Sequence, residues 1–220
     1  MTVLLNVVLP VFIVAGVAAL AHLRLRFEAR TLSRAVFYLF GPALVFDSLT
    51  GSEVGGAVFG QIAAAVLLTI LALWVLGSIA ARLLRLEGPT QAAFLVAVLL
   101  MNAGNFGLSV NYFAFGEVGL SWASLYFTIS ALLSSSLGAY LSARGRTTAR
   151  QALRRVAGVP YIYAAALGLL FNLGGVTMPE FLTKAIHLLA QASVPVMLAV
   201  LGVRLAETLR ARQRVQHLPA

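Results

Sequence analysis

The sequence predicts an all-α transmembrane protein of about seven helices, because of its composition and the length of its apolar stretches. Of its 220 residues, 60% are hydrophobic and 10% are charged, and the mean hydropathy is +0.94. Soluble domains usually carry about a quarter charged residues. A helix needs roughly 20 mostly apolar residues to cross a hydrocarbon core of about 30 Å. The long apolar runs lack the period-two alternation of barrel strands, so helices are expected.

Seven stretches reach the required length. In chain order they are Val3–Ala21, Ala35–Thr50, Ala57–Ala81, Thr90–Phe115, Leu120–Leu141, Val156–Gly174 and Phe181–Leu205. No basic residue precedes the first stretch and no small-residue cleavage site follows it, so it is expected to be a retained helix and not a signal peptide.

The connections between these stretches alternate in charge. Clusters of arginine follow the first, third, fifth and seventh: Arg24, Arg26, Arg30 and Arg34; Arg82 and Arg85; Arg144, Arg146, Arg150, Arg154 and Arg155; Arg204, Arg210, Arg212 and Arg214. The other connections hold Glu53, Glu117 and Glu180 and no Lys or Arg, and Lys184 alone of sixteen basic residues breaks the alternation. Because translocation disfavours Lys and Arg, the N-terminus is predicted outside and the C-terminus inside, in the cell (inner or plasma) membrane.

Several function classes are disfavoured. The net charge of +9 comes from short clusters between apolar runs, which argues for membrane topology and against a nucleic-acid partner. The chain has no cysteine, which excludes thiolate chemistry and disulfides. It has neither a G-x-S-x-G motif nor a pair of metal ligands at helical spacing, so an enzyme, a metal site and a cofactor are not predicted.

Two segments resemble each other in opposite orientations. L-S-R-A-V-F-Y-L at Leu32–Leu39 and L-T-K-A-I-H-L-L at Leu182–Leu189 share three identical and three conservative positions. Each leads to a proline, Pro42 or Pro195, ten to thirteen residues after its first leucine. The predicted spans that carry them run in opposite directions, which is typical of the inverted repeats of secondary transporters.

The repeat predicts a unit of five helices, and therefore an incomplete 5+5 fold. Residues 1–143 form the first unit, 144–155 a basic cytoplasmic loop, 156–205 the first two helices of the second unit and 206–220 a polar cytoplasmic tail. A second chain, a homo-oligomer or a longer gene product is then expected to supply the remaining three helices.

The fourth span carries the main candidate site, in L-L-M-N-A-G-N-F-G-L-S-V-N-Y from Leu99 to Tyr112. Its polar and flexible residues are Asn102, Gly104, Asn105, Gly107 and Asn111. Asparagine is costly in hydrocarbon unless it faces protein, water or substrate, and glycine weakens a helix. Together they suggest an interrupted helix whose second half presents its positive N-terminal end and amide groups to an anion. The alternative is that these residues serve helix packing.

Other polar residues allow further roles. Asp47, near the end of the second span, and His187, within the seventh, are candidates for coupling to a proton or to Na⁺; an interfacial carboxylate and a buried neutral imidazole are the alternatives. Lys184, His187 and Gln191 share one helical face, and Lys184 is expected to be an interfacial anchor. Pro10, Pro42 and Pro195 are expected to kink their helices.

Four motifs resemble the auxin efflux carrier family, whose bacterial members look like permeases for malate, malonate and related acids. They are L-N-V-V-L-P-V-F at Leu5–Phe12, G-P-A-L-V-F at Gly41–Phe46, N-A-G-N-F-G-L-S at Asn102–Ser109 and A-S-V-P-V-M-L-A-V-L-G-V-R-L at Ala192–Leu205. The resemblance implies two inverted five-helix units, with broken fourth and ninth helices crossing at the substrate site. The third motif of the family usually continues into proline, where this chain has Ser109.

The resulting expectation is an efflux-type secondary transporter or permease for small organic anions, working in the lipid bilayer by alternating access. Its expected substrate residues are Asn102, Gly104, Asn105, Gly107, Asn111 and Pro195. The alternatives are a membrane scaffold or sensory subunit that does not transport, and a truncated inactive carrier fragment.

Overall fold

The computed structural model describes residues 4–51, 56–99, 101–142, 150, 154 and 157–216, and in these ranges it is helical with no strand. The predicted basic loop at 144–155 lies almost wholly outside the described residues, as do Glu53 and the end of the tail at 217–220. The elements are η1 (Leu4–Val8), α1 (Leu9–Leu25), α2 (Ala29–Ala35), η2 (Val36–Phe40), α3 (Gly41–Thr50), α4 (Gly56–Leu83), α5 (Gly88–Leu99), η3 (Ala103–Leu108), α6 (Ser109–Ser142), α8 (Pro160–Leu173) and α9 (Glu180–Gln216), where η marks a π-helical segment.

Five helical stretches in the described part of the chain are long and apolar enough to span a membrane, where the sequence suggested about seven. They are Leu5–Leu25, Ala29–Thr50, Gly60–Leu83, Gly88–Ala131 and Glu180–Ala211. The predicted sixth span is α8, which is apolar but only 14 residues long. The all-α transmembrane class is therefore confirmed, and the chain is a multi-pass membrane protein.

The predicted fourth and fifth spans form one stretch in the structure, because α6 continues from the fourth into the fifth across a kink. Gly116 has φ 63° and ψ −151°, which no helix accommodates and which a side chain would strain. The predicted loop at Glu117 is therefore reduced to a kink at one non-helical residue, Gly116. At the other end of the chain, α9 continues helically to Gln216, well beyond the predicted boundary at Leu205.

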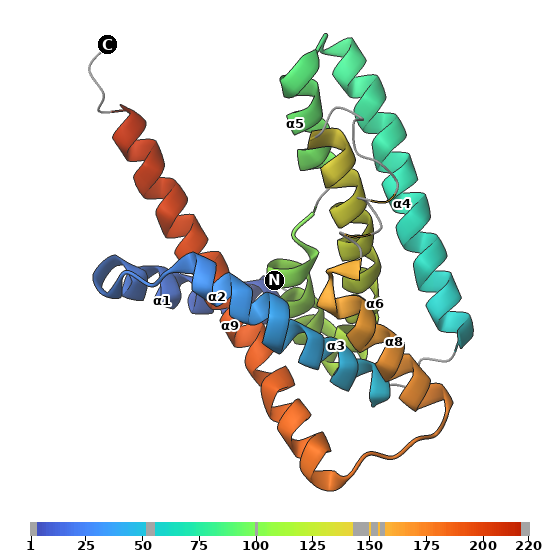
Figure 1. Cartoon of the computed structure of the whole chain (residues 1–220). Helices are drawn as coiled ribbons and strands as arrows, with labels where there is room; N and C mark the ends of the chain where they lie inside the picture. Colours follow the sequence, from blue (N-terminus) through green and yellow to red (C-terminus); the bar gives the residue numbers. More distant parts are fainter. Residues whose placement is uncertain are drawn as a thin grey trace.

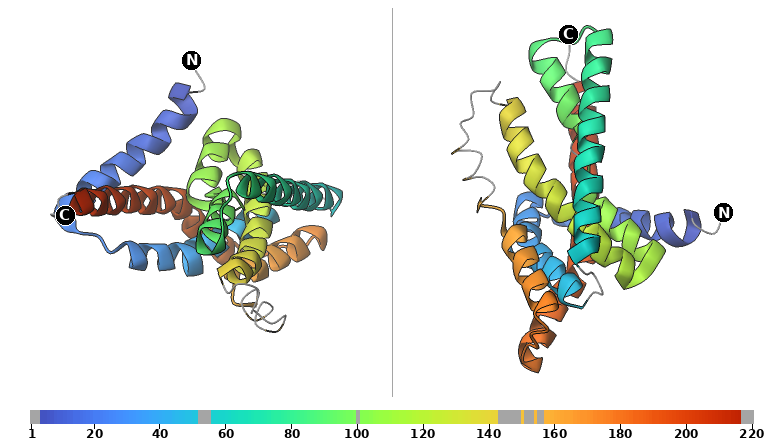
Figure 2. Two further views of the ribbon diagram at one scale, coloured as in Figure 1. Left: turned by 90° about the horizontal axis from the view of Figure 1, so that it is seen from above. Right: turned by 90° about the vertical axis from the view of Figure 1, so that its right-hand side faces the viewer.

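The helices form two groups. α1 and α3 both cross α9, and α3 also packs along α8; we call α1, α2, α3, α8 and α9 the layer (Figure 1). α4, α5 and α6 pack on one another and form what we call the bundle (Figure 2). Contacts of α6 with α3, and of η3 with α9, join the two groups.

Small residues allow the helices of the layer to approach closely. A Cβ on Gly202 of α9 would lie 1.9 Å from the carbonyl oxygen of Ala15 in α1. A Cβ on Gly41, at the start of α3, would lie 2.2 Å from the hydroxyl of Tyr161 in α8. Helices in lipid associate through such packing because burial of apolar surface gives little driving force there.

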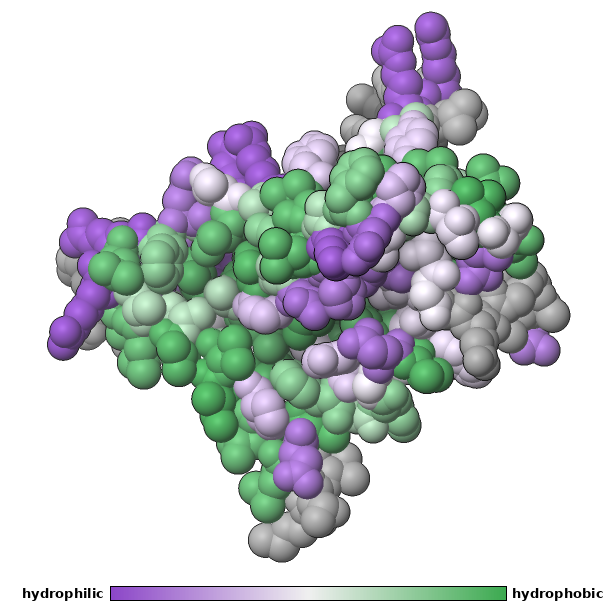
Figure 3. Space-filling model, turned by 90° about the horizontal axis from the view of Figure 1, so that it is seen from below, coloured by the Kyte–Doolittle hydropathy of each residue, from purple (hydrophilic) through white to green (hydrophobic). Residues whose placement is uncertain are grey.

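The largest buried cluster lies where the two groups meet. It is built from Val11, Val36, Leu44, Leu108, Leu120, Ala190, Val194, Met197, Leu198 and Val200. Leu108, the last residue of η3, has no exposed surface, so the second half of the predicted fourth span is fixed against α9. Apolar side chains also cover much of the outer surface (Figure 3). On α4, Leu68 and Leu76 are more than 60% exposed, as expected of a lipid-facing helix.

Candidate functional site

The predicted interruption of the fourth span is present. α5 ends at Leu99, Asn102 has non-helical angles (φ −78°, ψ 65°), and the chain resumes as the π-helical segment η3. The side chain of Asn102 caps this segment, since its Oδ1 accepts a hydrogen bond of 3.2 Å from the backbone N–H of Asn105. The backbone carbonyl of Asn102 accepts a second bond, of 3.1 Å, from Gly107 N–H. The interruption thus begins at Asn102, the first of the five residues that predicted it.

The two glycines of the interruption differ in their surroundings. A Cβ on Gly104 would lie 2.9 Å from Cε2 of Phe127 in α6, so close packing accounts for that glycine. A Cβ on Gly107 would have its nearest contact 3.6 Å away, at the carbonyl oxygen of Asn102. Packing alone therefore explains Gly104 but not Gly107. Ser109, at the position where proline was expected from the family motif, is fully buried and donates a hydrogen bond of 3.1 Å to the carbonyl of Asn105.

Three of the predicted residues border one cavity, which we call the first cavity. It has a volume of about 260 Å³ and is lined by Asn102, Gly104 and Asn105. Its opposite wall comes from the layer, with Tyr161 of α8 and Met197 of α9. The interruption therefore faces the junction between the bundle and the layer.

Two further predicted residues face a second cavity, of about 540 Å³, inside the bundle. Gly107 and Asn111 line it together with Gln61 of α4 and Trp122 of α6. The amide of Asn111 donates to the carbonyl of Gly107 at 2.8 Å, so part of its polar capacity serves its own helix. Gln61 was missed by the sequence analysis, although a single amide within the apolar third span was a usable signal.

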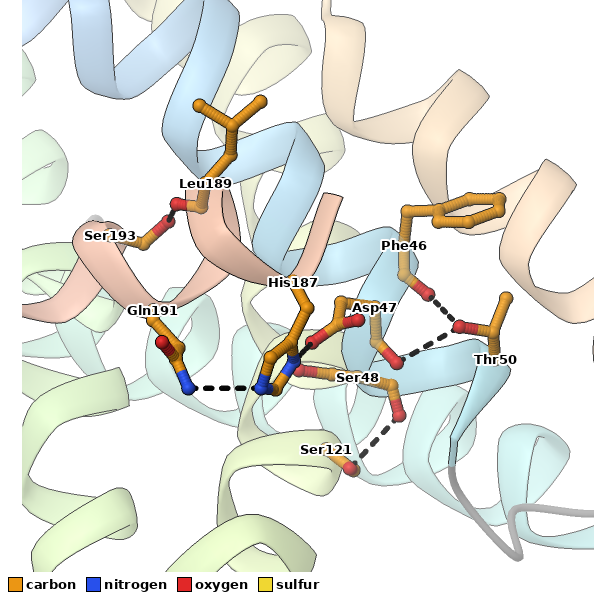
Figure 4. A network of polar contacts seen from close by, with 9 residues as sticks. All are labelled: Phe46, Asp47, Ser48, Thr50, Ser121, His187, Leu189, Gln191 and Ser193. Carbon is orange, nitrogen blue, oxygen red and sulfur yellow. Dashed lines mark hydrogen bonds and ion pairs between the residues drawn. The ribbon is translucent and has the colours of Figure 1, made fainter. Parts of the chain in front are cut away.

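The remaining predicted residues meet in a third cavity, of about 340 Å³, between α3, α6 and α9. Asp47, His187 and Pro195 line it, as do Glu117 and Gln191. The ring nitrogen Nδ1 of His187 lies 2.9 Å from Oδ2 of Asp47, and its Nε2 lies 2.9 Å from Nε2 of Gln191 (Figure 4). The sequence named Asp47 and His187 as separate candidates, and the structure brings them into direct contact across 140 positions.

The structure thus divides the predicted substrate residues among three cavities. Pro195 lies with Asp47 and His187 in the third cavity, away from the asparagines of the first. Lys184 forms an exposed ion pair of 2.6 Å with Glu180 one turn earlier, and neither lines the third cavity.

Three polar side chains that the sequence analysis did not single out bind the backbone of neighbouring helices. The hydroxyl of Tyr161 donates to the carbonyl of Val36, that of Ser193 to Phe40 and that of Ser121 to Ser48. Their partners lie 125, 153 and 73 positions away, so no local pattern could have indicated them.

The fold and these cavities define a helical multi-pass membrane protein with an interrupted span, and the comparison with known families agrees. The model of a family described as "Membrane transport protein" matches residues 3–151 and 142–217. The chain belongs to this family of membrane transport proteins.

Two curated relatives are also named as transporters. An uncharacterised transporter of Methanothermobacter thermautotrophicus is 31% identical over 186 residues, which are 81% of this chain and 59% of the relative. An uncharacterised transporter of Methanocaldococcus jannaschii is 23% identical over 186 residues, 81% of this chain and 60% of the relative. The chain thus spans about three fifths of the length of these relatives, and no solved structure matches it.

Proposed function

We propose that this chain forms the substrate pathway of a secondary transporter for small organic anions in the cell membrane. The observation that carries the proposal is the interrupted span, whose Asn102 and Asn105 border the first cavity between bundle and layer. π-helical segments and broken helices occur preferentially at functional sites, and in transporters they contribute half-helix ends to substrate binding.

The chemistry of the first cavity favours an anion. The N-terminal end of η3 and α6 carries a partial positive charge, and each asparagine amide supplies two donors. None of the described residues that line this cavity bears a carboxylate. Its volume of about 260 Å³ is below the roughly 300–1,000 Å³ of pockets for drug-sized ligands, which suits a small acid such as malonate or malate.

The contacts within the layer are consistent with alternating access by inverted repeats. If a two-fold axis exchanges the first two predicted spans with the last two, the contact of α1 with α9 corresponds to that of α8 with α3. The contact of α3 with α9 then corresponds to itself. All three pairings are present, and this supports a fold in which a homologous second interruption completes the site, contributed by further helices or by a second chain.

Flux of radiolabelled malonate and malate in proteoliposomes tests the proposal. Asn102→Ala combined with Asn105→Ala should lower substrate-stimulated flux at least tenfold, because a hydrogen bond to a charged group contributes about 1.5–3 kcal/mol. Asn172→Ala is the matched control, since Asn172 lies in α8 away from the three cavities and donates to the carbonyl of Thr50. Wild-type flux that persists in the double variant would remove Asn102 and Asn105 from the site, and absence of flux for every small acid tried would defeat the proposal.

A further inference from the structure

The third cavity contains a chain of three hydrogen-bonded side chains that joins two helices of the layer. Asp47 belongs to α3, whereas His187 and Gln191 lie one turn apart on α9 (Figure 4). Both contacts with the imidazole are 2.9 Å long. The side chain of Asp47 is 25% exposed and that of His187 is 54% exposed, so the ring is reachable from the cavity.

The partners of the imidazole determine where its proton lies. A carboxylate only accepts hydrogen bonds, so Nδ1 must carry the hydrogen that Asp47 Oδ2 receives. The amide of Gln191 turns its nitrogen, which only donates, toward Nε2, and in this orientation Nε2 is the acceptor. In this arrangement Nδ1 faces the carboxylate of Asp47 as a donor, and Nε2, which faces the amide of Gln191, is the position where a further proton can bind.

The charges around the imidazole favour a cation in this cavity. Glu117 of α6 lines the same cavity as Asp47 of α3, and the nearest basic side chain on α9, Lys184, is paired with Glu180 outside it. Tyr112 of α6 is the other titratable group in the lining. Two carboxylates would repel an anionic substrate and attract a cation, so the third cavity differs in charge from the first.

A proton fits this site better than a metal ion does. Na⁺ and other hard cations bind sets of oxygen atoms, whereas the central group here is an imidazole. Among the described residues no group of three or more His, Cys, Asp and Glu could hold a metal ion. The imidazole nitrogen of His187 therefore makes the third cavity better suited to a proton than to Na⁺ or another metal ion.

The third cavity also adjoins the helical segment that follows the interruption. Tyr112 and Phe113 line it, and both lie between Ser109 and the bend at Gly116. Pro195, another lining residue, lies four positions after Gln191, whose backbone carbonyl therefore lacks its usual helical donor. A change of charge at His187 would act both on α9 and on the segment that carries the candidate anion site.

We infer that Asp47, His187 and Gln191 form the coupling site of the transporter and that the coupling ion is a proton. This inference rests on the proposed function. A proton from solvent forms a bond to the Nε2 lone pair, while the hydrogen on Nδ1 stays bonded to Nδ1 and continues to be donated to Asp47. The Gln191 amide turns to present its oxygen to the new N–H. On release the Nε2–H bond breaks and the proton passes to solvent on the opposite side of the membrane, so each transport cycle carries one proton.

The tautomer of His187 can be measured without any substrate. NMR of protein labelled with ¹⁵N-histidine, assigned with His22→Gln and His217→Gln variants, should report the Nδ1–H form for His187 at alkaline pH. Asp47→Ala should convert the signal toward the Nε2–H form, while Lys184→Gln, which alters an exposed residue on the same helix, should leave it unchanged. An Nε2–H tautomer in the wild type would overturn the assignment of the proton-binding atom.

Accumulation of malonate in proteoliposomes tests the coupling itself. With the membrane potential clamped at zero by valinomycin and equal K⁺, an inward proton gradient should raise the steady-state accumulation ratio about tenfold per pH unit for one proton per substrate. His187→Gln and Asp47→Asn should bring this ratio to about onefold while exchange of internal for external malonate continues, and Lys184→Gln should behave as the wild type. Gradient-driven accumulation that survives in His187→Gln refutes the coupling role. A wild type that exchanges no malonate counts against malonate as a substrate of the proposed transporter, and the NMR measurement then decides the proton site by itself.

Discussion

Two segments of this protein interrupt the regular α-helical hydrogen-bond pattern in different ways. η2 stays helical within the continuous stretch Ala29–Thr50, whereas η3 follows the non-helical residue Asn102. The π-helical segment η2 precedes α3 and Pro42, and η3 precedes α6 and Ser109. At η2, side chains from neighbouring helices bind the backbone carbonyls: Tyr161 binds Val36 at 3.3 Å and Ser193 binds Phe40 at 2.5 Å. We call η2 the closed interruption.

At η3 the polar groups of the segment bind one another. The side chain of Asn102 caps the N–H of Asn105, and Ser109 binds the carbonyl of Asn105. Asn102 is exposed, and the segment borders cavities on two sides. We call η3 the open interruption.

The comparison separates a structural device from a candidate site. An interrupted helix leaves backbone groups without helical partners, and in lipid these groups must be satisfied inside the protein. In the closed interruption, the carbonyl of Val36 accepts from Gly41 N–H and from Tyr161, and that of Phe40 accepts from Ser193, so neighbouring helices pack closely on this segment and it serves packing. In the open interruption, Asn102 and Ser109 bind backbone groups of the same segment. The amide side chains of Asn102 and Asn105 border the first cavity, where a ligand can bind them.

The largest expected effect comes from filling the closed interruption. In Gly41→Ala the new Cβ would lie 2.2 Å from the hydroxyl of Tyr161, a residue that is 2% exposed. Tyr161 would have to leave its bond to Val36 and its contact with the ring of Phe127, 4.8 Å away. We expect the free energy of unfolding in mixed micelles to fall by about 1–3 kcal/mol, the usual range for overpacking.

Gly104→Ala is the matched variant at the open interruption. Its Cβ would meet only the edge of Phe127, at 2.9 Å. The loss of stability should be smaller than in Gly41→Ala, whereas malonate flux should fall, because the methyl group narrows the first cavity. Equal losses of stability in both variants would contradict the distinction between a closed and an open interruption.

A smaller effect is expected from removing one of the hydrogen bonds that neighbouring helices donate to the closed interruption. Ser193→Ala deletes the hydroxyl that binds the carbonyl of Phe40, at a position with no exposed surface. Loss of this hydrogen bond should lower the free energy of unfolding by about 0.5–1.5 kcal/mol. Flux per folded molecule should stay within about twofold of the wild type. A strong loss of flux with unchanged stability would show that this region takes part in transport.

The sequence was sufficient for features that depend on local chemistry. Apolar length predicted the helices, and the polar and glycine residues from Asn102 to Asn111 predicted the interruption. It could not predict that α8 would be only 14 residues long or that Gly116 would bend α6 without a loop. Whether the chain turns at one residue or through a longer loop depends on contacts with other helices, and these contacts leave no pattern in the local sequence.

Contacts between distant helices were likewise beyond the sequence. Asp47 and His187 were each noted as titratable groups, but only the crossing of α3 and α9 brings them together. Pro195 and the asparagines of the open interruption, in contrast, line different cavities. A repeat that relates two segments predicts their orientation, not which of their faces meet.

The smallest expected effect on stability, and the sharpest test of the open interruption, comes from Asn102→Asp. The carboxylate can accept the hydrogen bond from Asn105 N–H that the amide oxygen accepts, and a negative charge at a helix N-terminus is favourable by about 0.3–1 kcal/mol. The free energy of unfolding should therefore be unchanged or slightly higher. Flux of malonate should nevertheless be lost, because the carboxylate replaces two amide donors with a charge that repels the substrate. If the variant transports malonate as well as the wild type does, the anion does not bind at the capped end of η3. If the variant is destabilised instead, the amide group of Asn102 is needed for the fold. The open interruption would then have the structural role that we assign to the closed one.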